Sequence, residues 1–394
     1  MAFKANRRRF LEGAAVAAAF GPLRASTAGE SNNIYARLGV RPVINGVGTV
    51  TNLGGSIMPP EVVKAMEEAS RYFVPLPELQ VKAGAKLAEM LGVPAAMISA
   101  GAASAITVAT AACVVRGDAS KLHQLPDTDG LKNEVIQQTR HRSGYEAQML
   151  VAGVKIVRVE TRADLDAAIN DRTAMLHFLN VAEPRGEIKR EEWIAVGKQH
   201  GVPTFLDAAA DVPPVTNLSA YVKQGFDLVT FSGGKGLFGP QCSGMLLGRP
   251  DLIAAAQQSI SPHDGIGRGM KVGKEEIMGL LAAVERYLRL DHDAEARELE
   301  AKANHIIQAV AKAGVRGKID VPEIANHVPH ALLEWDESEK KITARDVVKQ
   351  LKDGEPSIAV SHERGGSGLR ISVWLMRGDE HKIVARRLRE IFNG

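Results

Sequence analysis

The chain has 394 residues, of which 45% are hydrophobic and 24% are charged, and its formal net charge is +3. This composition is typical of a folded chain with one large and one smaller domain, and it excludes a disordered or low-complexity protein. No internal apolar run approaches the ~20 residues that cross a bilayer, so we expect no stable membrane association.

The first 28 residues follow the order of a secretory signal. Three arginines at 7–9 precede an apolar stretch at 13–20, and small residues follow at 26–28. The Arg-Arg-x-Phe-Leu register that ends at Leu11 resembles the twin-arginine type. A disordered basic arm or an amphipathic anchor is the alternative. We predict a twin-arginine signal peptide over residues 1–28 and therefore a periplasmic or otherwise exported protein.

This signal accounts for the basicity of the chain. It holds five basic residues and one acidic residue, a net of +4, so the rest of the chain falls from +3 to about −1. Nucleic-acid affinity depends on the neutralisation of phosphates by basic side chains. We therefore expect no nucleic-acid partner for the mature chain.

From residue 95 onwards, short apolar runs alternate with helical patterns such as 103–115 and 190–200. Seven runs, most of them bounded by Gly, Pro or Asp, predict strands at 95–99, 133–138, 154–160, 174–180, 202–207, 227–232 and 244–248. This alternation predicts an α/β fold with a mostly parallel sheet that is covered by helices on both faces.

After Lys274 the pattern changes to one or two long helices that end at Gly314. Two strands and two helices are predicted beyond it, at 330–335, 368–374, 343–352 and 379–392. This part is expected to form a smaller α+β domain. The predicted organisation is a signal peptide (1–28), an N-terminal arm (29–50), a large domain (51–272) and a small C-terminal domain (273–394).

Ligands of open α/β sheets bind beyond the carboxyl ends of the strands, and Lys235 lies at such an end. It follows the predicted strand 227–232 inside the glycine-rich stretch "FSGGKGLFGPQCSG". Glycines would let a flat ligand approach closely, and a partly desolvated lysine can form a Schiff base. Taken alone, the pattern also fits a surface lysine in a flexible loop.

Three further groups lie at strand ends. Asp207 can pair with a protonated pyridine nitrogen, or it can simply cap a helix. The small-residue turn Ser99–Ala105 can present a helix N-terminus to a phosphate, or it can serve tight helix packing. His141 follows the strand 133–138, where it can stack on a planar ring or be an ordinary loop histidine.

The order of these four groups within one α/β domain is that of fold-type-I pyridoxal-phosphate (PLP) enzymes. The stretches "PVINGVGTVTNLGG", "ELQVKAGAKLAEMLGVPAAMISAGAASAITVATAACV", "FSGGKGLFGPQ" and "GMKVGKEEIMGLLAAVERYL" resemble the selenocysteine-synthase-like (SelA-like) branch. That branch includes the bacterial seryl-tRNA selenium transferase and the D-glucosaminate-6-phosphate ammonia-lyases. The resemblance covers about residues 34–394, and the Ser-Gly-Gly-Lys-x-x-x-Gly-Pro-Gln run is its most specific part.

The resemblance implies a fold-type-I large domain with a mostly parallel seven-stranded sheet, PLP as the cofactor, no metal, and a homodimer or larger homo-oligomer. It implies that Lys235 carries PLP as a Schiff base, that Asp207 pairs with the pyridine nitrogen, and that His141 stacks on the ring. The phosphate ligands that it implies are Gly101, Ala102, Ala103, Ser104 and Ser232. The substrate residues that it suggests are Arg370, Asn52, His263 and Arg268, and for Arg370 an ion pair is the alternative.

The implied activity is PLP-dependent chemistry on a small-molecule amino substrate, in which Lys235 removes the α-proton. We predict an ammonia-lyase that works by α,β-elimination on an amino acid or amino-sugar acid. A racemase or an aminotransferase is the alternative, because the same carbanion can be reprotonated at either of two carbons. An L-seryl-tRNA selenium transferase-like protein and a non-catalytic PLP-binding protein are further alternatives.

Overall fold

The computed structural model describes residues 33–363 and 368–393, so the predicted signal peptide lies outside the described residues. The chain divides into two units, 1–43 and 44–394. Within the first unit, the described part contains the short 3-10 helix Ala36–Leu38. All features of the site lie in the second unit. No helix of the described residues combines the length and the apolar composition needed to cross a membrane.

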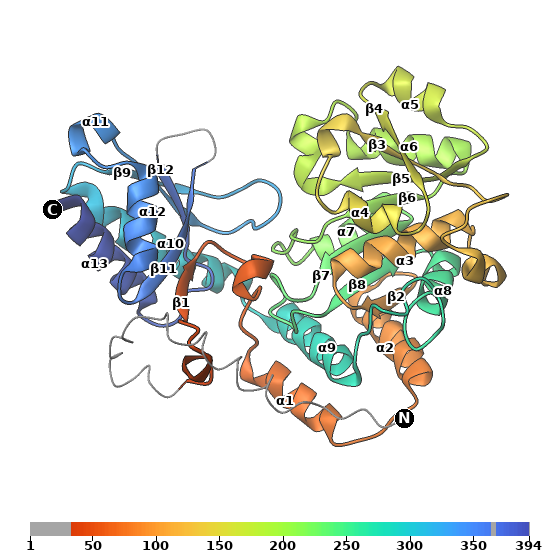
Figure 1. Ribbon diagram of the computed structural model, residues 1–394, viewed down its shortest axis with the longest axis horizontal. Helices are drawn as coiled ribbons and strands as arrows, with labels where there is room; N and C mark the ends of the chain where they lie inside the picture. Colours follow the sequence, from red (N-terminus) through yellow and green to blue (C-terminus); the bar gives the residue numbers. More distant parts are fainter. Residues whose placement is uncertain (1–32, 364–367, 394) are drawn as a thin grey trace, which may run out of the picture. The chain divides into compact units, whose positions relative to one another are not determined.

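The larger sheet contains all seven predicted strands, in the order β2-β8-β7-β6-β5-β3-β4 (Figure 1). These strands are β2 (Ala96–Ser99), β3 (Glu134–Gln138), β4 (Lys155–Val159), β5 (Thr173–Leu179), β6 (Thr204–Asp207), β7 (Leu228–Ser232) and β8 (Gly244–Gly248). The pairs from β4 to β7 are parallel, and β8 is antiparallel to both of its neighbours. The predicted α/β fold with a mostly parallel seven-stranded sheet is therefore confirmed.

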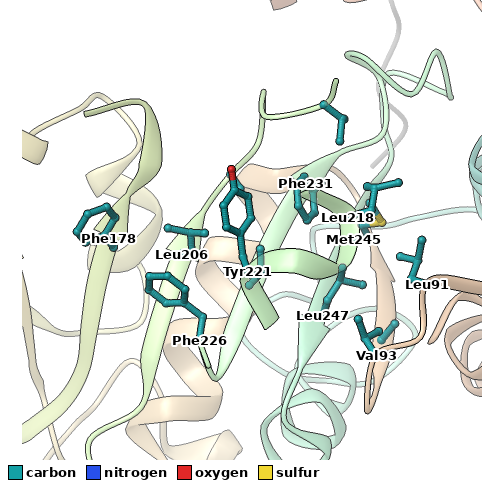
Figure 2. Packing of buried hydrophobic residues seen from close by; sticks show 14 of the residues in the cluster. Leu91, Val93, Phe178, Leu206, Leu218, Tyr221, Phe226, Phe231, Met245 and Leu247 are labelled. Atoms are coloured by element: carbon teal, nitrogen blue, oxygen red, sulfur yellow. The ribbon is translucent and has the colours of Figure 1, made fainter. Parts of the chain in front are cut away.

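Both faces of this sheet are buried, which explains why its strands are nearly continuous apolar runs. In β8, Met245 and Leu247 pack into the core on one face, and Leu246 packs into the core on the other. Figure 2 shows the first of these cores, in which Phe178 and Phe231 lie among aliphatic side chains from neighbouring strands and helices. Each such fully buried side chain contributes ~1.5–3 kcal/mol relative to exposure.

The helices around this sheet begin and end at ordinary sequence signals. They are α1 (Pro60–Ser70), α2 (Leu76–Leu91), α3 (Ala102–Val114), α4 (Glu146–Leu150), α5 (Arg162–Ala168), α6 (Arg190–His200), α7 (Asn217–Gln224), α8 (Pro250–Gln258) and α9 (Lys274–Arg289). Prolines open α1 and α8, where a missing N–H costs nothing. Gly92 ends α2 in the left-handed conformation.

The smaller sheet has five strands in the order β1-β11-β12-β10-β9. Its strands are β1 (Val43–Gly46), β9 (Arg316–Asp320), β10 (His330–Glu334), β11 (Ser357–His362) and β12 (Gly368–Ser372). Four helices accompany it, α10 (His292–Ala311), α11 (Glu337–Lys340), α12 (Ala344–Asp353) and α13 (Glu380–Asn393) (Figure 1). Its core is separate from the cores of the larger sheet.

The boundary between the two halves differs from the predicted one at 272/273. The apolar residues Ile277, Leu280 and Val284 of α9 belong to a core of the larger sheet. The core of the smaller sheet takes its first helical residue from α10, at Leu299, and it also includes Ile44 of β1. The smaller half therefore combines an N-terminal strand with the chain from α10 onwards, because β1 adds to the edge of its sheet.

Candidate active site

Lys235 and Asp207 line one cavity of about 180 Å³, which we call the lysine cavity. The carboxyl ends of β6 and β7 bring them together, because these two strands are parallel neighbours. The other lining residues are Thr49, Thr51, Gly55, Ala100, Gly101, Ala102, Ala103, Ile106, Tyr145, Ala209, Ser232, Gly234 and Gln241. Three of the four predicted groups therefore meet at one place, the lysine, the aspartate and the small-residue turn.

Asp207 is the last residue of β6 and is 5% exposed. One carboxylate oxygen accepts a hydrogen bond from the backbone N–H of Ala209 at 3.1 Å. Burial raises the pKa of this carboxyl, and the Ala209 N–H and Lys235 oppose the rise. Because burial disfavours the charge of this carboxylate, a cationic partner inside the cavity would stabilise it. In the described chain, no helix begins just after Asp207, so it is not a helix cap.

Lys235 lies in the turn between β7 and β8, shortly after Ser232. Burial lowers the pKa of its ammonium, and the carboxylates of Asp207 and Asp211 oppose that change. A lysine with a lowered pKa supplies more of the neutral amine, which is the nucleophilic and basic form. The surface-lysine alternative is wrong, because this side chain lies in a mostly buried position.

The glycines around Lys235 also have a packing role that the sequence did not predict. A Cβ on Gly233 would lie 2.2 Å from the Ser243 hydroxyl, and one on Gly236 would lie 2.1 Å from the Val212 carbonyl oxygen. A Cβ on Gly234 would lie 2.6 Å from a backbone atom of Gln241. These contacts are with the protein itself. The glycines let the turn pack against its own neighbours, and Gly234 also lines the lysine cavity.

The small-residue turn opens α3 at Gly101, whose φ is +105°. No side chain of the described residues caps the first turn of this helix, and Gly101, Ala102 and Ala103 line the lysine cavity. A helix start of this kind directs free N–H groups at an anion. Ser104 does not line the cavity, because its hydroxyl turns back to accept a bond from the Ala100 N–H at 3.2 Å. Ser232 does line it.

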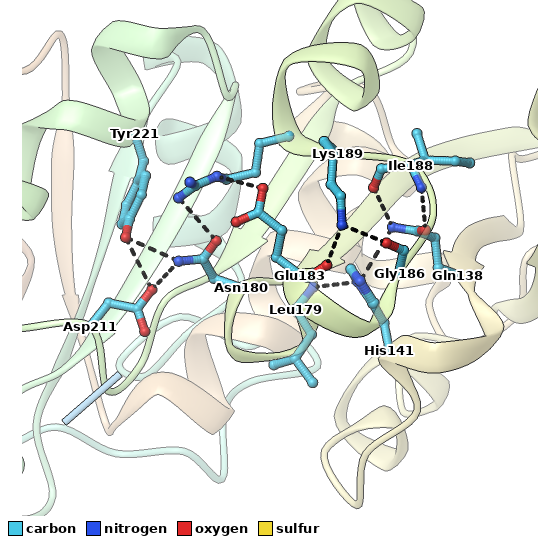
Figure 3. A network of polar contacts seen from close by, with 11 residues as sticks. Gln138, His141, Leu179, Asn180, Glu183, Gly186, Ile188, Lys189, Asp211 and Tyr221 are labelled. Carbon is cyan, nitrogen blue, oxygen red and sulfur yellow. Dashed lines mark hydrogen bonds and ion pairs between the residues drawn. The ribbon is translucent and has the colours of Figure 1, made fainter. Parts of the chain in front are cut away.

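His141 is not at the cavity, contrary to the prediction that it stacks on a ring there. Its ring is fully buried and meets Phe178 edge-on at 4.5 Å between centroids. Its Nδ1 accepts a hydrogen bond from the Leu179 N–H at 3.2 Å, and its Nε2 lies 3.2 Å from the amide nitrogen of Gln138 (Figure 3). Burial lowers its pKa to about 4, helped by the charges of two nearby basic side chains.

Tyr145 occupies the position at the cavity that was predicted for His141. The chain turns inward through the 3-10 helix Thr139–His141, which buries the histidine, and it returns to the cavity four residues later. The side chain of Tyr145 is 48% exposed and lines the lysine cavity. The sequence feature that could have identified Tyr145 is the presence of this aromatic residue in the same loop as His141, "HRSGYE".

A buried polar network lies behind Asp207 and was not predicted. Asn180 donates to Asp211 and to the hydroxyl of Tyr221, which itself lies 3.3 Å from Asp211 (Figure 3). Arg190 lies over the Tyr221 ring at 5.5 Å. Burial raises the pKa of Asp211 to about 6, and the charge of Asp207 adds to the rise. This network therefore places a second titratable carboxyl near the lysine.

Two further cavities follow the lysine cavity in a row, each sharing lining residues with the one before it. The entrance cavity, about 410 Å³, shares Thr49, Thr51, Tyr145 and Lys235 with it, and is also lined by the predicted Asn52. The distal cavity, about 420 Å³, shares Asn326, Val47 and Val50 with the entrance cavity. The distal cavity takes its remaining polar lining from the smaller sheet, at His330, Ser361, His362, Glu363, Arg370 and Ser372.

Arg370 lies in the distal cavity and not in the lysine cavity. It forms an ion pair with Asp320, and its Nε lies 3.6 Å from a carboxylate oxygen of Glu363. The ion pair that was the alternative for this residue is therefore present.

His263 and Arg268, which were predicted as substrate residues, do not line any of these three cavities. Arg268 lies 3.6 Å from Asp264 and 3.4 Å from the hydroxyl of Ser261, so its contacts are local. In the described part of the chain, no group of three or more His, Cys, Asp or Glu side chains could hold a metal ion.

The chain is similar to known proteins of about its own length. It is 32% identical over 372 residues to a 5'-C-glycyluridine monooxygenase-decarboxylase of a Streptomyces species, covering 91% of both chains. It is 31% identical over 372 residues to the D-glucosaminate-6-phosphate ammonia lyase of Salmonella typhimurium, covering 91% of this chain and 98% of the relative.

Solved structures agree with this relationship. A structure of D-glucosaminate-6-phosphate ammonia-lyase superimposes with a TM-score of 0.79 at 30% identity, over 92% of this chain and 99% of the other. A serine palmitoyltransferase from Sphingomonas wittichii shares the fold alone, with a TM-score of 0.57 at 15% identity over 89% and 87%. The predicted fold type I is confirmed. The family model described as SelA, L-seryl-tRNA selenium transferase, matches residues 43–313, and the chain belongs to this family.

Proposed function

We propose that the chain is a PLP-dependent ammonia-lyase that acts on an amino acid or amino-sugar acid. The observation that carries this proposal is that Lys235, Asp207 and the uncapped start of α3 line the same cavity. The similarity to a D-glucosaminate-6-phosphate ammonia lyase supports the reaction class. When bound, PLP would supply an electron sink for the carbanion that forms at the substrate α-carbon.

The residues present fit this cofactor. The N–H groups of Ala102 and Ala103 and the hydroxyl of Ser232 would hold the phosphate, since α3 directs its positive end into the cavity. Asp207 is buried and accepts its hydrogen bond from a backbone N–H rather than from a basic side chain, so it suits a protonated ring nitrogen. The phenol ring of Tyr145 would cover one face of the cofactor ring.

Lys235 would perform both the covalent attachment and the proton transfer. Its Nζ would accept the α-proton of the substrate, because burial favours the neutral amine. The carboxylate of Asp207 would accept a hydrogen bond from the protonated ring nitrogen and so stabilise that proton. Together the two residues would support removal of the α-proton, which is the first step of an α,β-elimination.

The deciding experiment is turnover of a panel of amino acids and amino-sugar acids by the purified holoenzyme. We expect stoichiometric release of ammonia and a keto acid without an added amino-group acceptor. Inversion of configuration without ammonia would indicate a racemase, and a requirement for a keto-acid acceptor would indicate an aminotransferase. Either result would overturn the lyase, and absence of turnover across the panel would indicate a non-catalytic PLP-binding protein.

The cofactor assignment has its own test. Borohydride reduction of the yellow protein should fix PLP on the peptide that contains Lys235. Asp207→Asn keeps the shape of the side chain but cannot hold the ring nitrogen protonated, so we expect a folded protein with turnover lower by about 10²-fold or more. Fixation on a different lysine, or near-normal turnover of Asp207→Asn, would contradict the proposed roles.

We also propose that the protein is exported through the twin-arginine route. The support is the order of basic, apolar and small residues over 1–28. Arg7→Lys combined with Arg8→Lys should retain the full-length chain in the cytoplasm, whereas the wild-type chain is recovered in the periplasmic fraction. Equal distribution of the two proteins would contradict export.

A homodimer without a nucleic-acid partner is the proposed assembly. Tyr72 and Phe73, between α1 and α2, are 63% and 105% exposed, and so large an exposed apolar pair is typical of an interface. Sedimentation of the holoenzyme should give a dimer or a larger homo-oligomer, and Phe73→Ser should weaken it. A monomer, or salt-sensitive binding of tRNA, would contradict this assembly.

A further inference from the structure

The distal cavity is linked to the reacting end of the site by the residues that line the entrance cavity. It shares Asn326, Val47 and Val50 with the entrance cavity, and the entrance cavity shares Lys235 with the lysine cavity. A substrate whose amino group reacts at Lys235 would therefore extend its tail past Asn326 into this space of about 420 Å³. The chemistry of the distal walls then decides which tails are accepted.

The smaller sheet places polar side chains next to one another on these walls. In its register, His330 of β10 lies opposite Asp320 of β9 on one side and opposite Ser372 of β12 on the other. Arg370 precedes Ser372 by two residues, so both side chains point to the same face of the sheet. Ser361 of β11 pairs with Arg370 and also lines the cavity.

Two polar atoms in this row lack a hydrogen-bond partner among the described residues. They are Nδ1 of His330 and Oγ of Ser372, in side chains that are 4% and 1% exposed. Nε2 of His330 lies 3.4 Å from the carbonyl oxygen of Asn326, which can only accept, so Nε2 carries the ring proton. Burial lowers the pKa of His330 to about 4, so the ring is neutral and Nδ1 presents a lone pair. Nδ1 of His330 can therefore accept a hydrogen bond, so it favours a ligand group that donates one and disfavours an anion.

Among the described residues, the positively charged side chain of this cavity is already paired. Arg370 forms an ion pair with Asp320, which lies outside the cavity lining, and its Nε lies 3.6 Å from Glu363, which lines the cavity. A phosphate placed here would meet the carboxylate of Glu363 and the lone pair of His330. A hydroxyl group avoids this conflict, because it can donate to Glu363 or His330 and accept from Ser372 or Arg370.

We infer that the distal cavity binds the hydroxylated, uncharged tail of an amino-sugar acid that carries no phosphate. This inference rests on the proposed function and names the substrate class for the same site. It also separates this chain from the relative that is named for a 6-phosphate. Asn326 lies at the junction between the reacting end and the tail end, so it belongs to both.

The test compares D-glucosaminate, its 6-phosphate and norleucine on the holoenzyme. Binding is measured from the change in cofactor absorption, and turnover from released ammonia. We expect D-glucosaminate to bind at least ten-fold more tightly than either of the other two. A preference for the 6-phosphate, or for norleucine, would overturn the inference while leaving the lyase intact. If no amino compound changes the absorption, the proposed function fails first and the inference fails with it.

Single substitutions test whether side chains of the distal cavity cause the preference for D-glucosaminate. Ser372→Ala should weaken D-glucosaminate binding about ten-fold and leave norleucine unchanged. Ser357→Ala is the control, because Ser357 is a buried serine of the same sheet that bonds the Lys352 carbonyl and does not line the cavity. Glu363→Gln removes a carboxylate and should improve binding of the 6-phosphate. Equal weakening of all three compounds by Ser372→Ala, in a protein with unchanged thermal stability, would overturn the inference.

Discussion

The backbone N–H of Asn326 donates a hydrogen bond to the carbonyl oxygen of Ala210 at 2.8 Å. Ala210 lies between Asp207 and Asp211, so this bond fastens the loop between β9 and β10 to the aspartate end of the lysine cavity. Asn326 has a φ of +48°, and Ala325 before it has a φ of +59°. Two successive non-glycine residues in the left-handed region are strained, and such strain is retained where function or packing requires it.

This loop gives a prediction that separates side-chain contact from backbone strain. Asn326→Ala and Asn326→Gly both remove the amide oxygen that accepts from the Thr49 hydroxyl at 3.1 Å. Only glycine relieves the left-handed backbone. We expect both variants to raise the KM several-fold, and the alanine variant to have the lower melting temperature. Unchanged KM values in steady-state assays would limit Asn326 to a structural role.

The proposal that Tyr145, and not His141, covers the cofactor ring can be tested by measuring how tightly the protein retains PLP. Tyr145→Ala should raise the dissociation constant of PLP about five-fold, since an aromatic contact contributes ~1 kcal/mol. Tyr145→Phe keeps the ring and should bind PLP nearly as well as the wild-type protein. Tyr35→Ala removes an exposed tyrosine outside the cavity and serves as the control in the same absorption titration. If Tyr145→Ala behaves like Tyr35→Ala, Tyr145 does not cover the ring.

The glycines of the turn that holds Lys235 pack closely against the protein. We therefore expect one added methyl group in this turn to lower the stability of the fold strongly. A Cβ on Gly236 would lie 2.1 Å from the Val212 carbonyl oxygen and 3.0 Å from the ring of Trp374. Gly236→Ala should lower the free energy of unfolding by more than ~2 kcal/mol and weaken PLP retention. Gly269→Ala, whose added Cβ meets nothing within 4 Å, should change neither. Urea unfolding of the two variants is the measurement, and equal stabilities would refute the packing role.

Buried neutral histidines predict a loss of stability in mild acid. Burial lowers the pKa of His177 to about 3 and the pKa values of His141 and His330 to about 4. An unfolded histidine titrates near 6.5, so the unfolded chain gains protons first as the pH falls from 6.5 toward 4. Each histidine then contributes a loss of ~2 kcal/mol at pH 5. Asp211 acts in the opposite direction, because its raised pKa lets the folded chain bind a proton first.

Urea unfolding at pH 7.5 and at pH 5 tests whether the free energy of unfolding falls in mild acid. His177→Gln should reduce the difference in unfolding free energy between the two pH values. His123→Gln, at an exposed histidine, is the control and should leave that difference unchanged. Greater stability of the wild-type protein at pH 5 than at pH 7.5 would contradict the prediction.

The larger sheet could be predicted from the sequence because both faces of its strands are buried. Each strand is then a short apolar run with a clear end, and the residue order alone is enough to place Asp207 and Lys235 at those ends. Three strands of the smaller sheet, β1, β9 and β11, lack this signal. The burial of β9 is partial or absent at every position, so its sequence does not differ from that of a loop.

The failure at His141 has a local cause. The sequence locates the end of β3, but it does not show that the next residues form a tight 3-10 turn that points inward. Gly186 completes this burial, because a Cβ there would lie 2.7 Å from Nε2 of His141. The glycine that admits the histidine is 45 positions away in the chain, so no local pattern could reveal it.

Gly244 lies where β8 begins, and a Cβ there would lie 2.5 Å from the carbonyl carbon of Gly101. Since β8 also pairs with β2 and with β7, the two anchors of the proposed cofactor are joined through one hydrogen-bonded strand. The distance between the phosphate end and the lysine end is therefore set by sheet geometry. Substitutions in the loop of Asn326 and in the walls of the smaller sheet can then alter substrate contacts without changing the spacing that suits the cofactor.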